Sequence, residues 1–250
     1  SQRVQAALER RLDVPYGQTK LQRLDVFPAR RPDAPVLLFL HGGYWQALDK
    51  GAFSFPAEPL VAAGAAYVSI NYDLAPAVSL DEIVAQCRQA LAWCRANAAS
   101  FNGDPGRIHL SGHSAGGHLA LMLVLTDWAG AETAPTGRVQ GACSISGVFD
   151  LEPLRLSYQN AVLGLDPESA RRNSPLYHLP RHAPPLIAAV GARETDEFRR
   201  QNGMLTTAWR ARGLPCEEMT LPALHHFDIV LELARPQSPL LRAVLAQMGL

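Results

Sequence analysis

The chain has 250 residues, and the 48% that are hydrophobic suffice for the core of one α/β domain. Its 23 basic and 23 acidic residues balance to a formal net charge of +0, which argues against electrostatic binding of nucleic acid or an anionic membrane. No apolar stretch approaches the ~20 residues of a membrane span, and the N-terminal segment lacks the apolar core of a signal peptide. We therefore predict one domain over residues 1–250, without nucleic acid or membrane as a partner; the oligomeric state stays open.

The cysteines are too dispersed for a zinc site or a C-x-x-C redox pair. Cys87 and Cys94 lie two turns apart on a predicted helix, roughly 10 Å by helical rise, which is too far for a disulfide. Buried free thiols are typical of proteins in a reducing compartment. We expect a cytoplasmic protein that binds no metal ion.

Short runs bounded by glycine and proline divide the first half of the chain into alternating helices and strands. The continuous apolar run over 36–40 predicts a strand buried on both faces of a parallel sheet. Ser79, with Glu82 three residues later, predicts a capping box at a helix start. In chain order we predict a surface helix over 1–13, an edge strand over 19–27, a strand over 36–40, a helix over 53–63, a strand over 66–70 and a helix over 79–98.

Two adjacent glycines follow the buried strand, in the sequence His41-Gly42-Gly43-Tyr44-Trp45. Glycines at the carboxyl end of a central strand leave backbone N–H groups approachable, and acyl transfer needs such donors facing the oxyanion. Together with the N–H that follows a nucleophilic serine, the predicted oxyanion donors are Gly42, Gly43 and Ala115. An ordinary glycine turn is the alternative, and His41 is expected to orient the loop. Tyr44 and Trp45 either line the acyl pocket as substrate-binding residues or pack beneath the loop.

The middle of the chain centres on Gly112-His113-Ser114-Ala115-Gly116, which reads G-x-S-x-G. A β-prone run over 107–111 precedes it, and an apolar, helix-prone run over 117–125 follows it. A strand, a tight glycine turn and a helix are the context of a nucleophile elbow, in which the serine stands in a strained turn at a helix N-terminus. We predict that Ser114 is a nucleophile; a plain turn between two elements is the alternative.

The order of elements up to a strand over 139–146, after a polar turn over 129–137, is β-α-β-α-β. This order predicts a mostly parallel, doubly wound central sheet flanked by helices. Residues 148–182 then hold many leucines, prolines and scattered arginines without a clear period. We predict that they form a small lid or cap insertion over the C-terminal edge of the sheet. A structural crossover that does not touch substrate is the alternative.

The last third of the chain predicts two more strands, each followed by candidate partners for the serine. Glu194 and Asp196 both lie just past a strand over 185–190, where the acid of a serine–histidine–acid triad belongs. Glu194 is favoured because it lies in the turn itself, whereas Asp196 is placed to cap a helix over 197–212. His225 and His226 both follow a strand over 216–221, where the general base is expected, and spacing does not separate them. We interpret the remaining histidines as structural or surface residues: His109, His113, His118, His178 and His182.

The order of serine, acid and histidine behind an H-G-G loop resembles the α/β-hydrolase fold and, within it, the hormone-sensitive-lipase-like esterases. The string His41-Gly42-Gly43-Tyr44-Trp45 is similar to the signature of the kynurenine formamidase (arylformamidase) group. Two further pieces match this group, Glu194-x-x-Glu197-Phe198-x-Arg200-Gln201 and His226-Phe227, and the resemblance covers most of residues 16–235. It implies Glu194 as the acid and His226 as the base. The better-known formamidases carry Asp at the acid position, and either carboxylate can hold a histidine.

These features predict a serine hydrolase that cleaves an aryl formamide, similar to N-formylkynurenine, or a small carboxylic ester through an acyl-enzyme. Ser114 would attack the carbonyl after His226, oriented by Glu194, takes its proton, and no metal or organic cofactor is needed. A broad short-chain carboxylesterase is the alternative. A third hypothesis is a non-catalytic binding protein that resembles the plant gibberellin receptors; those lose the catalytic histidine, whereas His226 is present here.

Overall fold

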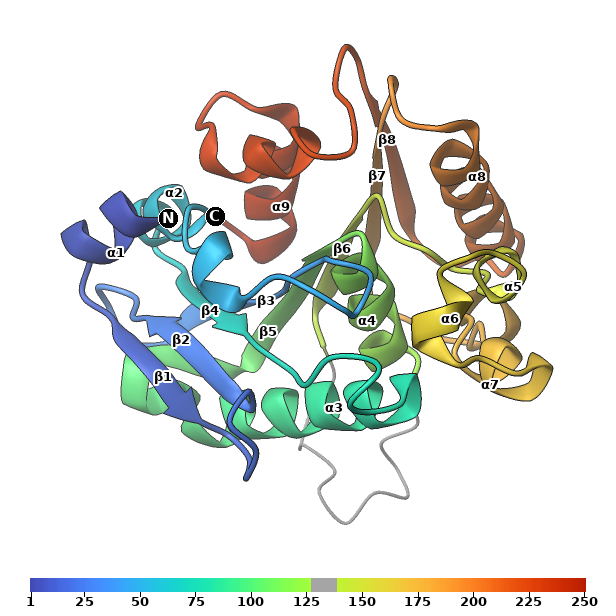
Figure 1. Ribbon diagram of the computed structural model, residues 1–250. Helices are drawn as coiled ribbons and strands as arrows, with labels where there is room; N and C mark the ends of the chain where they lie inside the picture. The colour runs from blue at the N-terminus through green and yellow to red at the C-terminus, as the bar shows by residue number, and fades with distance from the viewer. Residues whose placement is uncertain (127–138) are drawn as a thin grey trace.

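The computed structural model describes residues 1–126 and 139–250, and one eight-stranded sheet passes through it (Figure 1). The strand order is β1-β2-β4-β3-β5-β6-β7-β8; β1, β2 and β4 pair antiparallel, and all later neighbours pair parallel. The strands are β1 (Arg11–Pro15), β2 (Arg23–Phe27), β3 (Ala34–Leu40), β4 (Ala66–Ile70), β5 (Gly103–His113), β6 (Gly141–Ile145), β7 (Leu186–Gly191) and β8 (Cys216–Leu221). The predicted mostly parallel, doubly wound sheet is confirmed, while the predicted turn over 129–137 lies outside the described residues.

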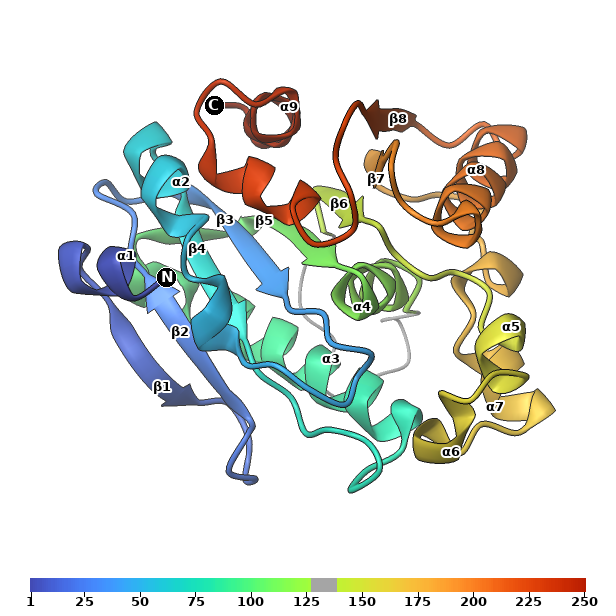
Figure 2. The same ribbon diagram turned by 45° about the horizontal axis from the view of Figure 1, so that its top comes forward.

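Helices pack on both faces of the sheet (Figures 1 and 2). One face is covered by α3 (Leu80–Asn97), α4 (Ala115–Val124) and α8 (Asp196–Ala211), and the other by α1 (Gln2–Ala7), α2 (Ala57–Ala63) and α9 (Pro239–Met248). Every residue of β3 is buried: Val36, Leu38 and Leu40 pack in the first core, and Leu37 and Phe39 in the second. Burial on both faces explains why this strand reads as a continuous apolar run.

Seven short helical elements complete the described part of the chain, and most of them lie in the connections that follow the strands. They are α5 (Glu152–Arg155), α6 (Asn160–Leu163), α7 (Pro167–Arg172), and the 3₁₀ turns η1 (Lys50–Phe53), η2 (Ala98–Phe101), η3 (Pro175–Tyr177) and η4 (Ile229–Ala234). No helix in the ranges described above has the length and apolar character needed to span a bilayer.

The N-terminal segment differs from its prediction in two ways. The helix predicted over 1–13 ends at Ala7, and residues from Arg11 onward form β1 instead, pairing Arg11 with Val26 and Val14 with Leu24. β2 is therefore not an edge strand, because β1 covers its outer side. The apolar positions that favoured a long helix do not share a buried face, since Val4 is buried while Leu12 is 40% exposed. Pairing with a distant strand overrides the local helical pattern.

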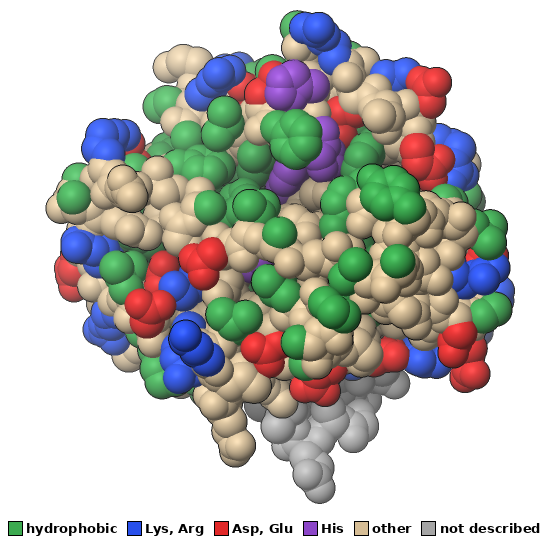
Figure 3. Space-filling model, in the orientation of Figure 1, with side chains coloured by type: hydrophobic (Ala, Val, Ile, Leu, Met, Phe, Trp, Pro, Cys, Tyr) green, Lys and Arg blue, Asp and Glu red, His purple; other side chains and the backbone are tan. Residues whose placement is uncertain are grey.

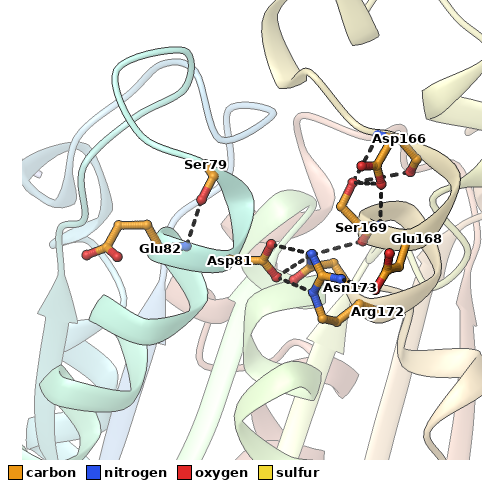
Figure 4. A network of polar contacts seen from close by, with 8 residues as sticks. All are labelled: Ser79, Asp81, Glu82, Asp166, Glu168, Ser169, Arg172 and Asn173. Atoms are coloured by element: carbon orange, nitrogen blue, oxygen red, sulfur yellow. Dashed lines mark hydrogen bonds and ion pairs between the residues drawn. The ribbon is translucent and has the colours of Figure 1, made fainter.

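Residues 148–182 lie at the α8 side of α4 and contain α5, α6, α7 and η3 (Figures 1 and 2). Their middle is fastened to the first turn of α3: Arg172 donates to both carboxylate oxygens of Asp81, at 3.0 and 2.8 Å, and Asn173 Nδ2 donates to Asp81 Oδ1 at 2.9 Å (Figure 4). Ser79 caps α3 by accepting from the Glu82 N–H at 3.2 Å, as predicted. The Glu82 carboxylate accepts from Gln86 instead of completing the capping box.

Candidate active site

Ser114 stands in a strained turn between β5 and α4. It occupies the N-cap position of α4 with φ 58° and ψ −120°, a conformation that L-residues rarely adopt, and its N–H donates to Ile145 O at 2.8 Å. A side chain at Gly112 would bring a Cβ within 2.1 Å of Gly116 O, and one at Gly116 within 2.0 Å of Leu40 O. Both glycines of the motif are required because backbone packs directly against them.

Three side chains from three loops meet at the carboxyl edge of the sheet. His226 Nε2 lies 3.0 Å from Ser114 Oγ, and His226 Nδ1 lies 2.7 Å from Glu194 Oε2. A carboxylate only accepts hydrogen bonds, so Nδ1 carries the proton and Nε2 is left to accept from the serine hydroxyl. Neither alternative joins them: the Asp196 side chain is 95% exposed beside Arg199, and His225 pairs with Asp228 at 3.2 Å.

Glu194 is buried, yet its surroundings favour the charged carboxylate. Ser146 Oγ donates to Glu194 Oε1 at 2.5 Å, and the Gly191 N–H donates to the same oxygen at 2.8 Å. Burial alone would raise the pKa of Glu194, but the hydrogen bonds from His226, Ser146 and Gly191 outweigh it and leave the pKa below its usual value. Sequence reasoning missed Ser146; its place directly after β6, at the edge where the other loops converge, was the available signal.

The imidazole of His226 is held by rings on several sides. The Phe198 ring stacks on it with centroids 4.2 Å apart, and the His113 ring lies 4.7 Å away. His113 Nε2 donates to the backbone carbonyl of His226 at 2.7 Å, so the residue before the serine also holds the loop that carries the histidine. Burial, with repulsion from His226, lowers the pKa of His113 to about 3. His113 therefore stays neutral, with the proton on the Nε2 that donates to the His226 carbonyl.

The glycine loop after β3 lies directly beside Ser114. A Cβ added to Gly42 would lie 3.1 Å from Ser114 Cβ, and Gly43 adopts φ +110°, where a Cβ would meet Ala47 O at 2.2 Å. Within the described ranges, the N–H groups of Gly42 and Gly43 donate to no other group, and Ala115 is the first residue of α4, whose N–H has no intrahelical partner. His41 donates from Nδ1 to Gly42 O at 2.7 Å. Of the three predicted oxyanion donors, Gly42 lies against Ser114, Ala115 follows it in the chain, and Gly43 lines the same cavity as Ser114.

Tyr44 and Trp45 take different positions. Tyr44 lines the cavity that contains Ser114, whereas Trp45 is 0% exposed, lines none of the cavities described below and packs edge-on against His118 with centroids 4.9 Å apart. The substrate-binding prediction is therefore corrected for Trp45, because its ring fills the core beneath the loop. That packing was the alternative considered for it.

Two adjacent cavities open at this edge. The serine cavity, of about 440 Å³, is lined by Gly43, Tyr44, Leu48, Phe53, Phe55, His113, Ser114, Thr195, Phe198, His226, Phe227, Val230 and Leu231. The side cavity, of about 280 Å³, is lined by Tyr44, Val148, Pro153, Leu154, Ser157, Tyr158, Gln159, Thr195, Glu197, Phe198 and Gln201. Six residues of the side cavity come from the predicted lid segment, and none of the serine cavity does. On this face of the molecule, histidine side chains reach the surface between hydrophobic side chains (Figure 3).

The BD-FAE family matches residues 24–198, well over half of the chain. The chain belongs to this family. Kynurenine formamidase of Danio rerio is 32% identical over 256 residues, which cover 100% of this chain and 85% of that protein. Esterase LipQ of Mycobacterium tuberculosis is 31% identical over 243 residues, covering 87% of this chain and 57% of that protein. The chain is thus a hydrolase of the esterase and formamidase group, and the resemblance drawn from its motifs is confirmed.

Solved structures agree with this assignment. A provisionally assigned thioesterase from Silicibacter sp. TM1040 superposes with a TM-score of 0.86 at 28% identity, covering 100% of this chain and 89% of that one. Esterase B from Lactobacillus rhamnosis superposes with a TM-score of 0.81 at 19% identity, covering 99% of this chain and 90% of that one, and this likeness concerns the fold. The predicted α/β-hydrolase fold is confirmed.

Proposed function

We propose that the chain hydrolyses an aryl formamide or a small carboxylic ester through an acyl-enzyme on Ser114. The single observation that carries the mechanism is the chain of hydrogen bonds from Glu194 through His226 to Ser114, at 2.7 and 3.0 Å. His226 Nε2 takes the proton of Ser114 as Oγ bonds to the substrate carbonyl carbon. It then gives that proton to the leaving oxygen or nitrogen as the bond to the carbonyl carbon breaks. Water, activated by the same nitrogen, releases the acid.

The oxyanion of each tetrahedral intermediate is assigned to the N–H groups of Gly42, Gly43 and Ala115. The closeness of Gly42 to Ser114, the place of Gly43 in the wall of the serine cavity, and the lack of an acceptor among the described residues for either glycine N–H support this role. Such donors act in a site from which water is largely excluded, and losing one costs about 10²–10³ in rate in comparable enzymes. Glu194 fixes the proton on Nδ1 and stabilises the imidazolium while it exists.

Two groups of relatives favour different substrates for this machinery. The formamidases of Danio rerio and Salmo salar, 32% and 33% identical, favour an aryl formamide such as N-formylkynurenine. The mycobacterial esterases and the apolar lining of the serine cavity favour a small carboxylic ester, the second candidate. Measuring kcat/KM for both N-formyl-L-kynurenine and p-nitrophenyl acetate decides between them. A kcat/KM above ~10⁴ M⁻¹s⁻¹ on the formamide marks it as the physiological class.

We further propose that the whole chain is one catalytic domain in which residues 148–182 serve as a cap beside the site. The contacts of this segment with α3 and its share of the side cavity support that role. All four cysteines are free, at positions 87, 94, 143 and 216, which supports a reducing, cytoplasmic compartment.

The catalytic assignment is tested with a fluorophosphonate probe and with Ser114→Ala. We expect the wild-type protein to be labelled at Ser114 with loss of hydrolysis, and Ser114→Ala to be neither labelled nor active. Ser111→Ala is the matched control, because Ser111 lies three residues earlier on β5 with its hydroxyl fully buried, and it should be labelled like the wild type. Hydrolysis that survives in pure Ser114→Ala protein would refute the mechanism, and an unlabelled wild type would support a binding protein instead.

A further inference from the structure

We propose that the side cavity binds the leaving group of the substrate, and that this leaving group is a neutral, flat ring system. The inference rests on the proposed function and narrows its substrate class. It favours an aryl ester or a simple aryl formamide over N-formylkynurenine, whose leaving group carries an ammonium and a carboxylate. It concerns the 280 Å³ cavity beside the serine cavity, which lies between α5, the loop after it and the start of α8.

The two cavities are continuous through shared walls. Tyr44, Thr195 and Phe198 line both of them, so a ligand bonded to Ser114 can extend from one into the other. Thr195 occupies the N-cap position of α8, but its side chain does not cap the helix, and its hydroxyl is left at the junction. An ester or amide substrate has an acyl portion and a leaving group, one on each side of the bond that breaks. Two joined cavities can hold these two portions separately.

The position of His226 assigns the side cavity to the leaving group. The leaving atom has to receive its proton from His226 Nε2, so this portion of the substrate begins next to the imidazole. The Phe198 ring stacks on that imidazole at 4.2 Å and also lines the side cavity. Because Phe198 lines both cavities, a leaving group that begins beside His226 in the serine cavity can follow the Phe198 ring into the side cavity. The acyl portion is left with the apolar walls of the serine cavity, such as Phe53, Phe55 and Val230.

The charges of the side cavity select a neutral occupant. Glu197 is the one charged residue among the described residues that line it, and Arg200 pairs with both of its carboxylate oxygens at 2.7 Å. Gln201 has no capacity to spare: its oxygen accepts from the N–H groups of Phe149 and Asp150, and its nitrogen donates to Glu197 and to Asp150 O. An ionic substituent would lose its hydration without gaining a free counter-charge.

The side chains that line the side cavity favour a flat leaving group. Tyr44, Tyr158 and Phe198 present three rings, and Val148, Pro153 and Leu154 present aliphatic surface. Rings of this kind favour stacked or edge-on contact with a flat aromatic group. A cavity of about 150 Å³ already holds benzene, so one of about 280 Å³ has room for a substituted or fused ring. The side cavity thus fits the phenol, naphthol or arylamine portion of an ester or amide.

The experiment fills the side cavity and varies each half of the substrate separately. Leu154→Trp, on α5, places a larger side chain into the cavity, and Leu154→Phe is a milder version should the tryptophan disturb folding. We expect kcat/KM for 2-naphthyl acetate to fall about 10-fold or more, while ethyl acetate and ethyl hexanoate stay within about twofold of wild type. Inhibition by the product 2-naphthol should weaken in parallel. Leu156→Trp is the matched control, because Leu156 is 70% exposed and lines neither cavity.

The outcomes separate the inference from the function on which it rests. Loss of activity confined to ethyl hexanoate would mean that the cavity holds the acyl group and would overturn the inference alone. Equal effects of Leu154→Trp and Leu156→Trp on 2-naphthyl acetate would overturn it too. A wild-type protein that cleaves none of these esters and no aryl formamide would refute the proposed function, and the inference with it.

Discussion

Ser146 shows how much of the site depends on a residue that touches neither the serine nor the histidine. Its hydroxyl donates to the oxygen of Glu194 that His226 leaves free, and so it holds the carboxylate in the orientation that His226 needs. Ser146 adopts φ 51° and is buried, so both its backbone and its side chain are constrained. If Glu194 orients His226 as proposed, we expect Ser146 to be a positioning residue that acts through Glu194.

Removing the Ser146 hydroxyl should lower kcat about 10-fold with little change in KM, since a hydrogen bond to a buried charge contributes about 1.5–3 kcal/mol. The loss of one donor should also raise the pKa of Glu194, so the acid limb of the kcat/KM profile should move to higher pH. Ser146→Gly is the better variant, because glycine accepts the positive φ that strains Ser146→Ala.

The matched control is Ser144→Ala, two residues earlier on β6. The Ser144 hydroxyl is buried and forms no hydrogen bond among the described residues, so its removal should leave kcat and the pH profile unchanged. Wild-type kcat in Ser146→Gly, with a loss in Ser146→Ala only, would assign the effect to backbone strain and contradict the positioning role.

At the scale of elements, the local sequence pattern predicted those bounds of helices and strands that depend on neighbouring residues. The strands over 66–70 and 216–221 have the predicted bounds. Every residue of β4 is buried, whereas in β8 only Leu221 is, so flanking turns rather than burial define β8. The helix predicted through residue 13 failed because Arg11 and Val14 pair with β2, a contact that no local period reveals. The choice between Glu194 and Asp196, or between His225 and His226, depends on which neighbouring side chain of a turn points inward. Only the assembled loops settle that direction.

Several hydrogen bonds join residues 148–182 to the rest of the described molecule, and Asp81 accepts three of them. It accepts from Arg172 and Asn173 at 2.8–3.0 Å, and Asn173 O accepts from His118 Nε2 at 2.7 Å (Figure 4). The Arg172–Asp81 pair is about half exposed, so it contributes little to global stability. Its effect should be local to α7.

We therefore expect Asp81→Ala to speed amide hydrogen exchange over residues 166–174 several-fold, while Tm changes by only about 1–3 °C. Glu82→Ala is the matched control: Glu82 is the next acidic residue in the same first turn of α3, and it bonds to Gln86 rather than to α7. Equal exchange over 166–174 in both variants would show that other contacts hold α7 in place.

At the scale of the whole molecule, three histidines are buried in their neutral form in or beside the central sheet: His109 and His113 on β5 and His118 on α4. Burial lowers the pKa of His109 and His118 to about 4 and that of His113 to about 3, from a usual value of 6.5. Between these values the unfolded chain binds protons that the folded protein does not. Stability is therefore complete above about pH 6.5 and falls as the pH drops toward 4.

His109→Gln should reduce this acid sensitivity, because the variant removes one group that takes up a proton on unfolding. Each such histidine contributes a slope of up to about 1.4 kcal/mol per pH unit, so the free energy of unfolding lost between pH 7 and pH 5 should shrink by up to about 2 kcal/mol in the variant. Urea denaturation at both pH values measures it. His178→Gln, at an exposed histidine, should lose as much stability as the wild type. An equal loss of unfolding free energy between pH 7 and pH 5 in His109→Gln and His178→Gln would contradict this. It would mean that His109 takes up its proton in the folded protein, so that burial does not keep it neutral.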